Sequence, residues 1–277
     1  MTKVKSVYHL LIHAVLIAGA LLMLLPFVWM ILTSFKTFKE SIMLPVTWLP
    51  EQWSFNNYAE VLDRLEFGRY YANTIIVTVS VVAGQLVFCQ MAAYALSRLE
   101  FPGRKLIFAV ILTVMMVPTQ MTVIPNYFTT VSFGIANTFA GIILPLLPTA
   151  YGIFFFTQVF KSVPLEIEQS AYIDGCSPFR TFVSIAVPIS KNGIISYGIL
   201  VTLFAWNELF WPLIVISSDQ MRTLSVAIAS LKSYRSVSTQ YQILMAASVM
   251  TIVPVLAVFI IGQKQFISGI ASGAVKG

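Results

Sequence analysis

Long apolar runs dominate this chain and decide what it can fold into. A helix crosses about 30 Å of hydrocarbon with about 20 residues. Six runs of roughly this length or more occur, at residues 7-33, 71-97, 105-125, 138-160, 191-216 and 239-262. Only 10% of the 277 residues are charged, against about 25% in soluble domains. We therefore predict an all-α integral membrane protein with six transmembrane helices, in one transmembrane domain over residues 1-277 and with no separate soluble domain.

The first run could be mistaken for a cleaved signal peptide, because it follows Lys3 and Lys5 and contains the small residues Ala18, Gly19 and Ala20. Its apolar sequence continues through LLMLLPFVWMIL, which is too long for a signal peptide and has no polar cleavage region. We interpret this run as a retained span.

The positive charge predicts the orientation, because basic residues that flank spans stay on the cytoplasmic side. With a cytoplasmic N-terminus, the C-terminus is also cytoplasmic, and the inner segments account for the whole net charge of +6. Nucleic acid is therefore not needed to explain the basic composition. The inner charges are Lys3, Lys5, Arg98, Arg104, Lys105, Lys161, Arg180, Lys191, Lys264 and Lys276 against Glu100, Glu166, Glu168 and Asp174.

The longest outer segment spans about residues 34-70. Its prolines and its Trp48 and Trp53 predict an ordered loop at the headgroup level, followed by a short amphipathic helix near 55-66. A loop without a ligand role is the simpler interpretation. Prolines also lie within or beside the apolar runs and predict kinks, at Pro26, Pro118, Pro145, Pro148, Pro212 and Pro254.

The sequence gives little support for a metal site or a disulfide bond. His9 and His13 are four residues apart, as metal ligands can be, but no third ligand accompanies them. Cys89 lies inside a span and Cys176 in a cytoplasmic loop, so no disulfide is implied. Neither a catalytic nucleophile with a base nor a metal cluster is recognisable, which argues against an intramembrane enzyme.

The polar stretch between the fourth and fifth runs is unusual for this chain. Glu166 and Glu168 favour the positive end of a helix, and Gly175 can end it, which predicts a helix over 164-174. A second helix begins after Ser177 and carries an apolar stripe. The first helix has the small, neutral centre Gln169-Ser170-Ala171, which fits a groove of a partner protein. An ordinary solvated loop helix is the alternative.

The stretch VPLEIEQSAYIDGCSPFRTFVSIAVPI resembles the EAA loop of permease subunits of ATP-binding cassette (ABC) importers. Gln169, Ser170 and Ala171 match the Glu-Ala-Ala triplet, Asp174-Gly175 the following glycine turn, and Ile185, Val187 and Pro188 the later Ile-x-Leu-Pro element. Gln169 and Ser170 depart from the pattern. AYALSRLEFPGRK, WNELFWPL and the ending QKQFISGIASGAVKG are similar to the smaller permease of the carbohydrate branch, which handles oligosaccharides and glycerol phosphates.

The resemblance implies a type I importer in a bacterial or archaeal cytoplasmic membrane. In that family a second homologous permease completes the pathway, two cytoplasmic ATPases drive alternating access, and an external binding protein delivers the sugar. The C-terminal tail can also reach the ATPases. ATP and Mg are expected on the ATPases, and no G-x-x-x-x-G-K-[ST] motif occurs in this chain. The residues implied in coupling are Glu166, Glu168, Gln169, Ser170, Ala171, Asp174, Gly175 and Pro188.

Polar residues within the spans are candidates for the translocation path, because each costs free energy unless it faces protein or water. Hydrogen bonds between helices explain them equally well. An ion-coupled secondary transporter is the alternative function, but only Glu208 offers a carboxylate within a span. The candidates chemically suited to sugar hydroxyls and ring faces are Gln85, Trp206, Asn207, Glu208 and Trp211.

Overall fold

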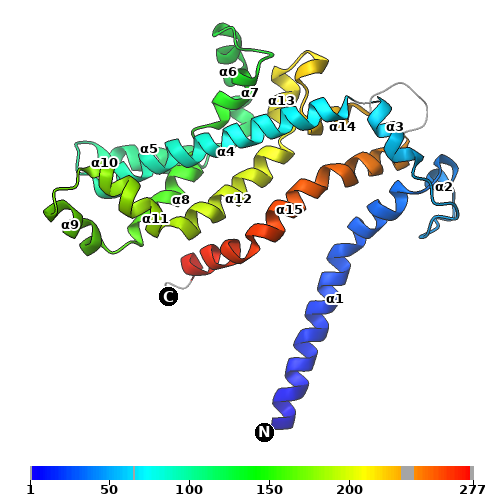
Figure 1. The fold of residues 1–277 in the computed structure, drawn as a ribbon, viewed down its shortest axis with the longest axis horizontal. Helices are drawn as coiled ribbons and strands as arrows, with labels where there is room; N and C mark the ends of the chain where they lie inside the picture. The colour runs from blue at the N-terminus through cyan, green and yellow to red at the C-terminus, as the bar shows by residue number, and fades with distance from the viewer. Residues whose placement is uncertain (1, 65, 232–239, 275–277) are drawn as a thin grey trace. The chain divides into compact units, whose positions relative to one another are not determined.

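The computed structural model describes residues 2–64, 66–231 and 240–274, and within these ranges its regular elements are all helices (Figure 1). The chain forms two compact units, unit 1 from Met1–Phe67 and Ile228–Val253, and unit 2 from Gly68–Ala227 and Pro254–Gly277. The longer α-helices are α1 (Thr2–Ser34), α3 (Asn56–Arg64), α4 (Phe67–Arg98), α5 (Arg104–Val114), α6 (Thr119–Ser132), α8 (Ala150–Lys161), α9 (Leu165–Ile173), α12 (Lys191–Asn207), α14 (Leu224–Leu231) and α15 (Tyr241–Ala274). The shorter helices are α2 (Phe38–Ile42), α7 (Phe139–Ile143), η1 (Leu144–Leu146), α10 (Pro178–Thr181), η2 (Phe182–Ala186), α11 (Val187–Ile189), α13 (Phe210–Val215) and η3 (Asp219–Met221).

The helices confirm the membrane class. Four stretches are long and apolar enough to cross a bilayer, namely Leu11–Ser34, Phe67–Arg98, Lys191–Val215 and Tyr241–Lys264. Two further runs form bent pairs: α5 with α6 at 104°, and α7 and η1 with α8 at 47°. Six spans result if each pair counts as one span, and that count stays a prediction. The helix expected near 55-66 is α3, and the predicted C-terminal charge Lys276 lies outside the described residues.

Prolines lie at both sharp bends. Pro118 is the residue immediately before α6, and Pro145 and Pro148 flank the junction between η1 and α8. A proline provides no backbone N–H and disfavours a helical residue before it, so it ends or bends a helix. Pro26 and Pro254, in contrast, lie inside the continuous helices α1 and α15.

In unit 1 the C-terminal end of α1 is closed by side chains of the following segment. The Asn57 amide donates hydrogen bonds of 2.8 Å to the carbonyl oxygens of both Ser34 and Lys36, and the Tyr58 hydroxyl lies 2.7 Å from Ser34 Oγ. The Phe35 ring packs against Trp53, Phe55 and Tyr58. The segment that leaves α1 is therefore folded back on the helix end and ordered.

Among the described side chains of unit 1, Lys36 is the most deeply buried charge, with 1% of its surface exposed. Its ammonium lies 4.3 Å from the centre of the Trp29 ring and donates to the carbonyl oxygen of Thr47, and Trp48 packs edge-on against Trp29. Burial lowers the pKa of Lys36, and the nearby Glu40 carboxylate opposes that shift. Trp48 is thus part of the packing around this lysine while still half exposed.

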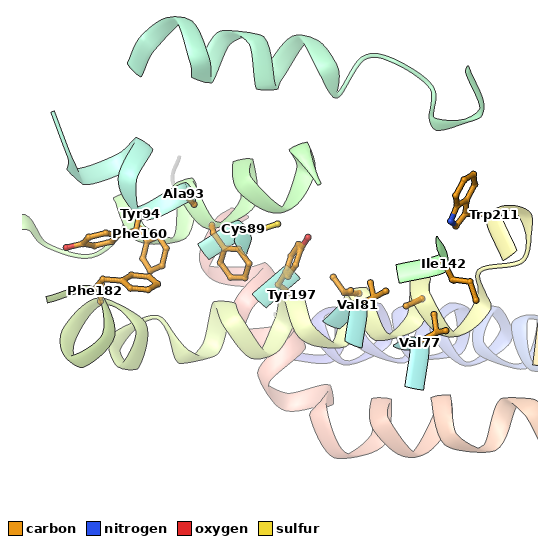
Figure 2. Close-up of a cluster of buried hydrophobic side chains, with 14 of the residues drawn as sticks. Val77, Val81, Cys89, Ala93, Tyr94, Ile142, Phe160, Phe182, Tyr197 and Trp211 are labelled. Carbon is orange, nitrogen blue, oxygen red and sulfur yellow. The ribbon is translucent and has the colours of Figure 1, made fainter. Parts of the chain in front are cut away.

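Unit 2 has a continuous apolar core between α4, α8 and α12 (Figure 2). Tyr94, Phe160 and Phe182 form an aromatic group at one end of the core, and Ile142 and Trp211 lie at the other end. The middle of the core contains a polar network, in which the Tyr197 hydroxyl donates to Gln85 and lies 3.1 Å from Thr149 Oγ1. This network requires a close approach between helices, which Gly152 on α8 permits.

We expect Gly152→Ala to destabilise the protein by about 1–3 kcal/mol, since overpacking a filled core carries a cost of this size. A Cβ at this position would overlap the Tyr197 hydroxyl and lie 2.8 Å from Thr149 Oγ1 and 2.9 Å from Cys89 Sγ. Thermal unfolding in detergent measures the effect. Gly19→Ala is the control, because nothing lies within 4 Å of a Cβ there. Equal unfolding temperatures for the two variants would contradict the packing described.

Candidate functional site

The helix α9 is the centre of the candidate site, and its ends follow from local sequence. Pro164 precedes the helix, and Glu166 and Glu168 occupy its first turn, where the helix dipole favours negative charge. The helix ends at Ile173, and Gly175, two residues later, has a φ of +81° that glycine readily adopts. The Cys176 N–H then donates to the Ala171 carbonyl at 2.9 Å, and Ser177 caps α10 by accepting from the Arg180 N–H. The result is a helix, a tight turn and a second helix.

Most of α9 is exposed, and only one narrow face is buried. Glu168 and Ala171, three residues apart, point inward. Gln169 and Ser170 are exposed, so the predicted small triplet is divided between the two faces. The Ser170 hydroxyl bonds to the Glu166 carbonyl of its own helix. Asp174, Gly175 and, in α11, Pro188 are also exposed.

The exposed part of this region is apolar at its tip. Ile173 is 87% exposed, and Phe179 on the adjoining α10 is 66% exposed. Leu165, Ile167 and Tyr172 add further exposed apolar surface along α9. We call the exposed side chains of Leu165, Ile167, Tyr172, Ile173 and Phe179 the tip surface. An exposed apolar surface of this kind on a short ordered helix is typical of a protein contact.

The buried face of α9 is held by a charged contact. Glu168 is 1% exposed, and its Oε1 lies 2.8 Å from Nε of Arg98, the last residue of α4. Its other oxygen accepts a hydrogen bond of 2.9 Å from the Tyr94 hydroxyl. Arg98 Nη2 donates to the carbonyl oxygens of Phe160 and Val163 at 2.6 Å each, at the end of α8. We call Tyr94, Arg98 and Glu168 the α9 anchor.

The sequence predicted Glu168 as a site residue but missed Tyr94 and Arg98 as its partners. Arg98 ends a long apolar run, so the sequence predicts only a cytoplasmic flanking charge at this position. A signal was present: of two carboxylates two residues apart in one helix, one can face inward, and a buried carboxylate needs a cation.

Three of the five candidate translocation residues are buried and engaged in packing. Gln85 donates to the Leu146 carbonyl and accepts from the Tyr197 hydroxyl, both at 2.7 Å. Trp211 donates from its indole nitrogen to the Gly141 carbonyl at 3.1 Å. Trp206 is 5% exposed and packs edge-on against Tyr71. Gln85 and Trp211 thus satisfy carbonyl groups of neighbouring helices.

The other two candidates lie at the break between α12 and α13. Asn207 is exposed and bonds to the Leu203 carbonyl of its own helix. Glu208 is half-buried, and its Oε1 accepts the Trp211 N–H at 3.0 Å, in the first turn of α13. The structure therefore brings Glu208 and Trp211 together, while Gln85 belongs to the separate network in the middle of unit 2.

Within residues 2–64, 66–231 and 240–274, no group of three or more His, Cys, Asp and Glu side chains is arranged to hold a metal ion. His13 Nδ1 lies 2.7 Å from the His9 carbonyl oxygen, so this ring nitrogen is in hydrogen-bond contact with the backbone of its own helix.

Comparisons with known proteins point to one family. Residues 85–271 match the family described as binding-protein-dependent transport system inner membrane component. The chain is 32% identical over 266 residues to the diacetylchitobiose uptake system permease protein NgcG of Streptomyces coelicolor, covering 95% of this chain and 88% of the relative. It is 33% identical to the arabinooligosaccharides transport system permease protein AraQ of Bacillus subtilis, covering 98% and 97%.

A solved structure supports the same assignment. The structure is described as a bacterial ABC transporter involved in the import of the acidic polysaccharide alginate. One of its chains superposes with a TM-score of 0.84 and 25% identity, covering 94% of this chain and 96% of that chain.

We expect Glu208→Ala to lower stability by about 1 kcal/mol, the usual cost of removing a side chain that caps a helix. Glu208→Gln keeps an acceptor oxygen for the Trp211 N–H, so its loss should be smaller. Thermal unfolding in detergent compares the variants, with Asn207→Ala as control because that side chain is exposed and bonds within its own helix. An equal loss for Ala and Gln would contradict the capping role.

Proposed function

The chain belongs to the family of binding-protein-dependent transport system inner membrane components, and from this premise we propose that it is a permease subunit of an ATP-driven carbohydrate importer. It forms half of the translocation pathway, and a second homologous permease forms the other half. An external binding protein delivers the sugar, and a pair of cytoplasmic ATPases binds and hydrolyses ATP with Mg. The protein lies in the cytoplasmic membrane with both termini inside.

The observation that carries this proposal is α9, an exposed helix with an apolar tip that is firmly anchored to the spans. Such a helix suits a contact that must transmit force, because its outer face is free for a partner and its inner face is bound. We assign the tip surface, with Gln169, Ser170, Asp174 and Gly175, to contact with an ATPase subunit. Glu166 also faces outward, whereas Glu168 and Ala171 hold the helix and Pro188 lies on the following α11.

The substrate class follows from the relatives. Their names specify diacetylchitobiose, arabinooligosaccharides and, for a Brucella suis permease that is 27% identical, sn-glycerol-3-phosphate. All three compounds are rich in hydroxyl groups. We propose a hydroxyl-rich carbohydrate or carbohydrate derivative as substrate, with Asn207 and Glu208 at the α12–α13 break as the candidates in the path. Family membership favours this function over an ion-coupled secondary transporter.

Gentle purification from the native membrane tests the function. We expect the chain to be recovered with a second permease and an ATPase, and ATP hydrolysis to rise when a sugar-loaded binding protein is added. Diacetylchitobiose, arabinooligosaccharides, alginate oligosaccharides and sn-glycerol-3-phosphate form the first panel of substrates. Recovery without any ATPase, together with uptake driven by a proton or sodium gradient, would contradict the proposal.

The tip surface is tested by Ile173→Asp, which places a charge at its most exposed apolar position. We expect association with the ATPase to weaken about tenfold or more, since apolar side chains at interface centres often contribute about 2 kcal/mol. The variant should remain folded, because Ile173 is 87% exposed. Binding of purified ATPase to the reconstituted permease pair measures the change. Ile173→Val is the control, and unchanged ATPase binding by the Asp variant would exclude this surface.

A further inference from the structure

The α9 anchor joins three helices through one side chain. We propose that Arg98 is a positioning residue that locks α9 to both α4 and α8, so that a displacement of α9 moves these spans together. This inference rests on the proposed function, in which α9 contacts the ATPase. It assigns Arg98 and its partners a role in transmitting that contact into the membrane.

The guanidinium group of Arg98 suits this role because its donors point in different directions from one rigid plane. Nε lies 2.8 Å from the Glu168 carboxylate on α9, while Nη2 donates at 2.6 Å to the carbonyl groups of Phe160 in α8 and of Val163 in the linker to α9. A cation at the C-terminal end of a helix also complements the helix dipole. One side chain of α4 thus fixes both neighbours.

Little of the ion pair is exposed, with 9% of the Arg98 side chain and 1% of the Glu168 side chain accessible. The Tyr94 ring packs against Phe160 on α8 and Phe182 on η2, with ring centres 5.6 and 5.0 Å apart (Figure 2). The Tyr94 hydroxyl donates to Glu168 and lies 3.4 Å from the Tyr172 hydroxyl of α9. One carboxylate oxygen of Glu168 therefore accepts a hydrogen bond from Tyr94, and the other pairs with Arg98 by charge at 2.8 Å without a well-aligned hydrogen bond.

Stability alone does not explain a buried ion pair. The cost of removing two charges from water often exceeds their attraction, so a well-packed apolar pair of similar volume is frequently as stable or more stable. Apolar side chains, however, would not tie α9 to the carbonyl groups of α8 in one fixed geometry. The fixed geometry is what a transmitted movement requires.

The helix α4 can transmit a displacement of α9 from the α9 anchor to the segment around η3. It contains no proline and no break, whereas each other span in the described ranges contains a proline, a break or both. Near its first residues, Asn73 donates to the carbonyls of Gln220 and Arg222 at 2.9 Å each, and Thr74 Oγ1 accepts from the Leu224 N–H at 2.8 Å. Asn73 and Arg98 are about 37 Å apart along a straight helix. One rigid helix therefore joins the anchor to the segment around η3.

The test compares purified complexes, each containing both permeases and the ATPases, in liposomes. Arg98→Met and Glu168→Met each leave a buried charge unpaired, and we expect either change alone to impair assembly. The double variant Arg98→Met/Glu168→Met leaves no unpaired charge, so assembly and ATP hydrolysis should recover. The ATP hydrolysed per substrate molecule taken up should nevertheless rise about fivefold or more, the lower end of typical coupling factors.

The substrate probe is the compound of the panel above that the wild-type complex takes up. Glu100→Gln is the matched control, because this carboxylate is exposed in the loop that follows α4. A double variant with the wild-type ratio of ATP to substrate would overturn the proposal. Should the double variant fail to assemble, Tyr94→Phe decides the question, because it removes only one hydroxyl group from the anchor: a raised ratio supports the proposal and an unchanged ratio overturns it.

A second readout does not depend on transport. Backbone amides of α9 should exchange hydrogen for deuterium faster in the double variant, or in Tyr94→Phe, than in wild type, and unchanged exchange would contradict the anchoring role. If the wild-type complex shows no ATP-driven uptake, this result would contradict the proposed function and not the role of Arg98. The two failures are therefore distinguishable.

Discussion

A backbone carbonyl or N–H group in lipid has no water to bond to, and this constraint explains the hydrogen bonds of Gln85 and Glu208 in unit 2. Every break in a span releases such groups. At the junction between η1 and α8, Gln85 donates to the Leu146 carbonyl. At the break after α12, Glu208 accepts the Trp211 N–H. Bent helices and polar side chains thus occur together because each break needs a partner.

The same constraint acts where the bent pairs meet α13. Asn137, in the turn before α7, has a positive φ of 57°, and its side-chain oxygen accepts from the Ser217 and Ser218 backbone N–H groups. Its own N–H donates to the Val215 carbonyl. Trp211 adds a bond to the Gly141 carbonyl. The irregular backbone around Asn137 therefore has hydrogen-bond partners for these groups within the protein.

Sequence patterns predicted the spans and the bends because both depend on local features. Run length indicated the spanning helices, and Pro118 and Pro145 marked the two sharp bends. The limits of α9 also followed from Pro164 and Gly175. The partners of the polar residues could not be predicted in this way. The contact between Gln85 and Tyr197 joins residues 112 positions apart, and only the packing of α4 against α12 shows that Gln85 bonds to protein.

The two adjacent polar residues Glu168 and Gln169 lie on different faces of α9. Because successive helical residues point about 100° apart, one can be buried while the next is exposed. Glu168 faces inward and carries the charge that binds Arg98, and Gln169 faces outward and is neutral. The departure from the Glu-Ala-Ala pattern at position 169 therefore removes no charge from the anchor. The exposed charges of α9 and its C-cap are instead the carboxylates of Glu166 and Asp174, and Ile173 is the most exposed apolar side chain beside them.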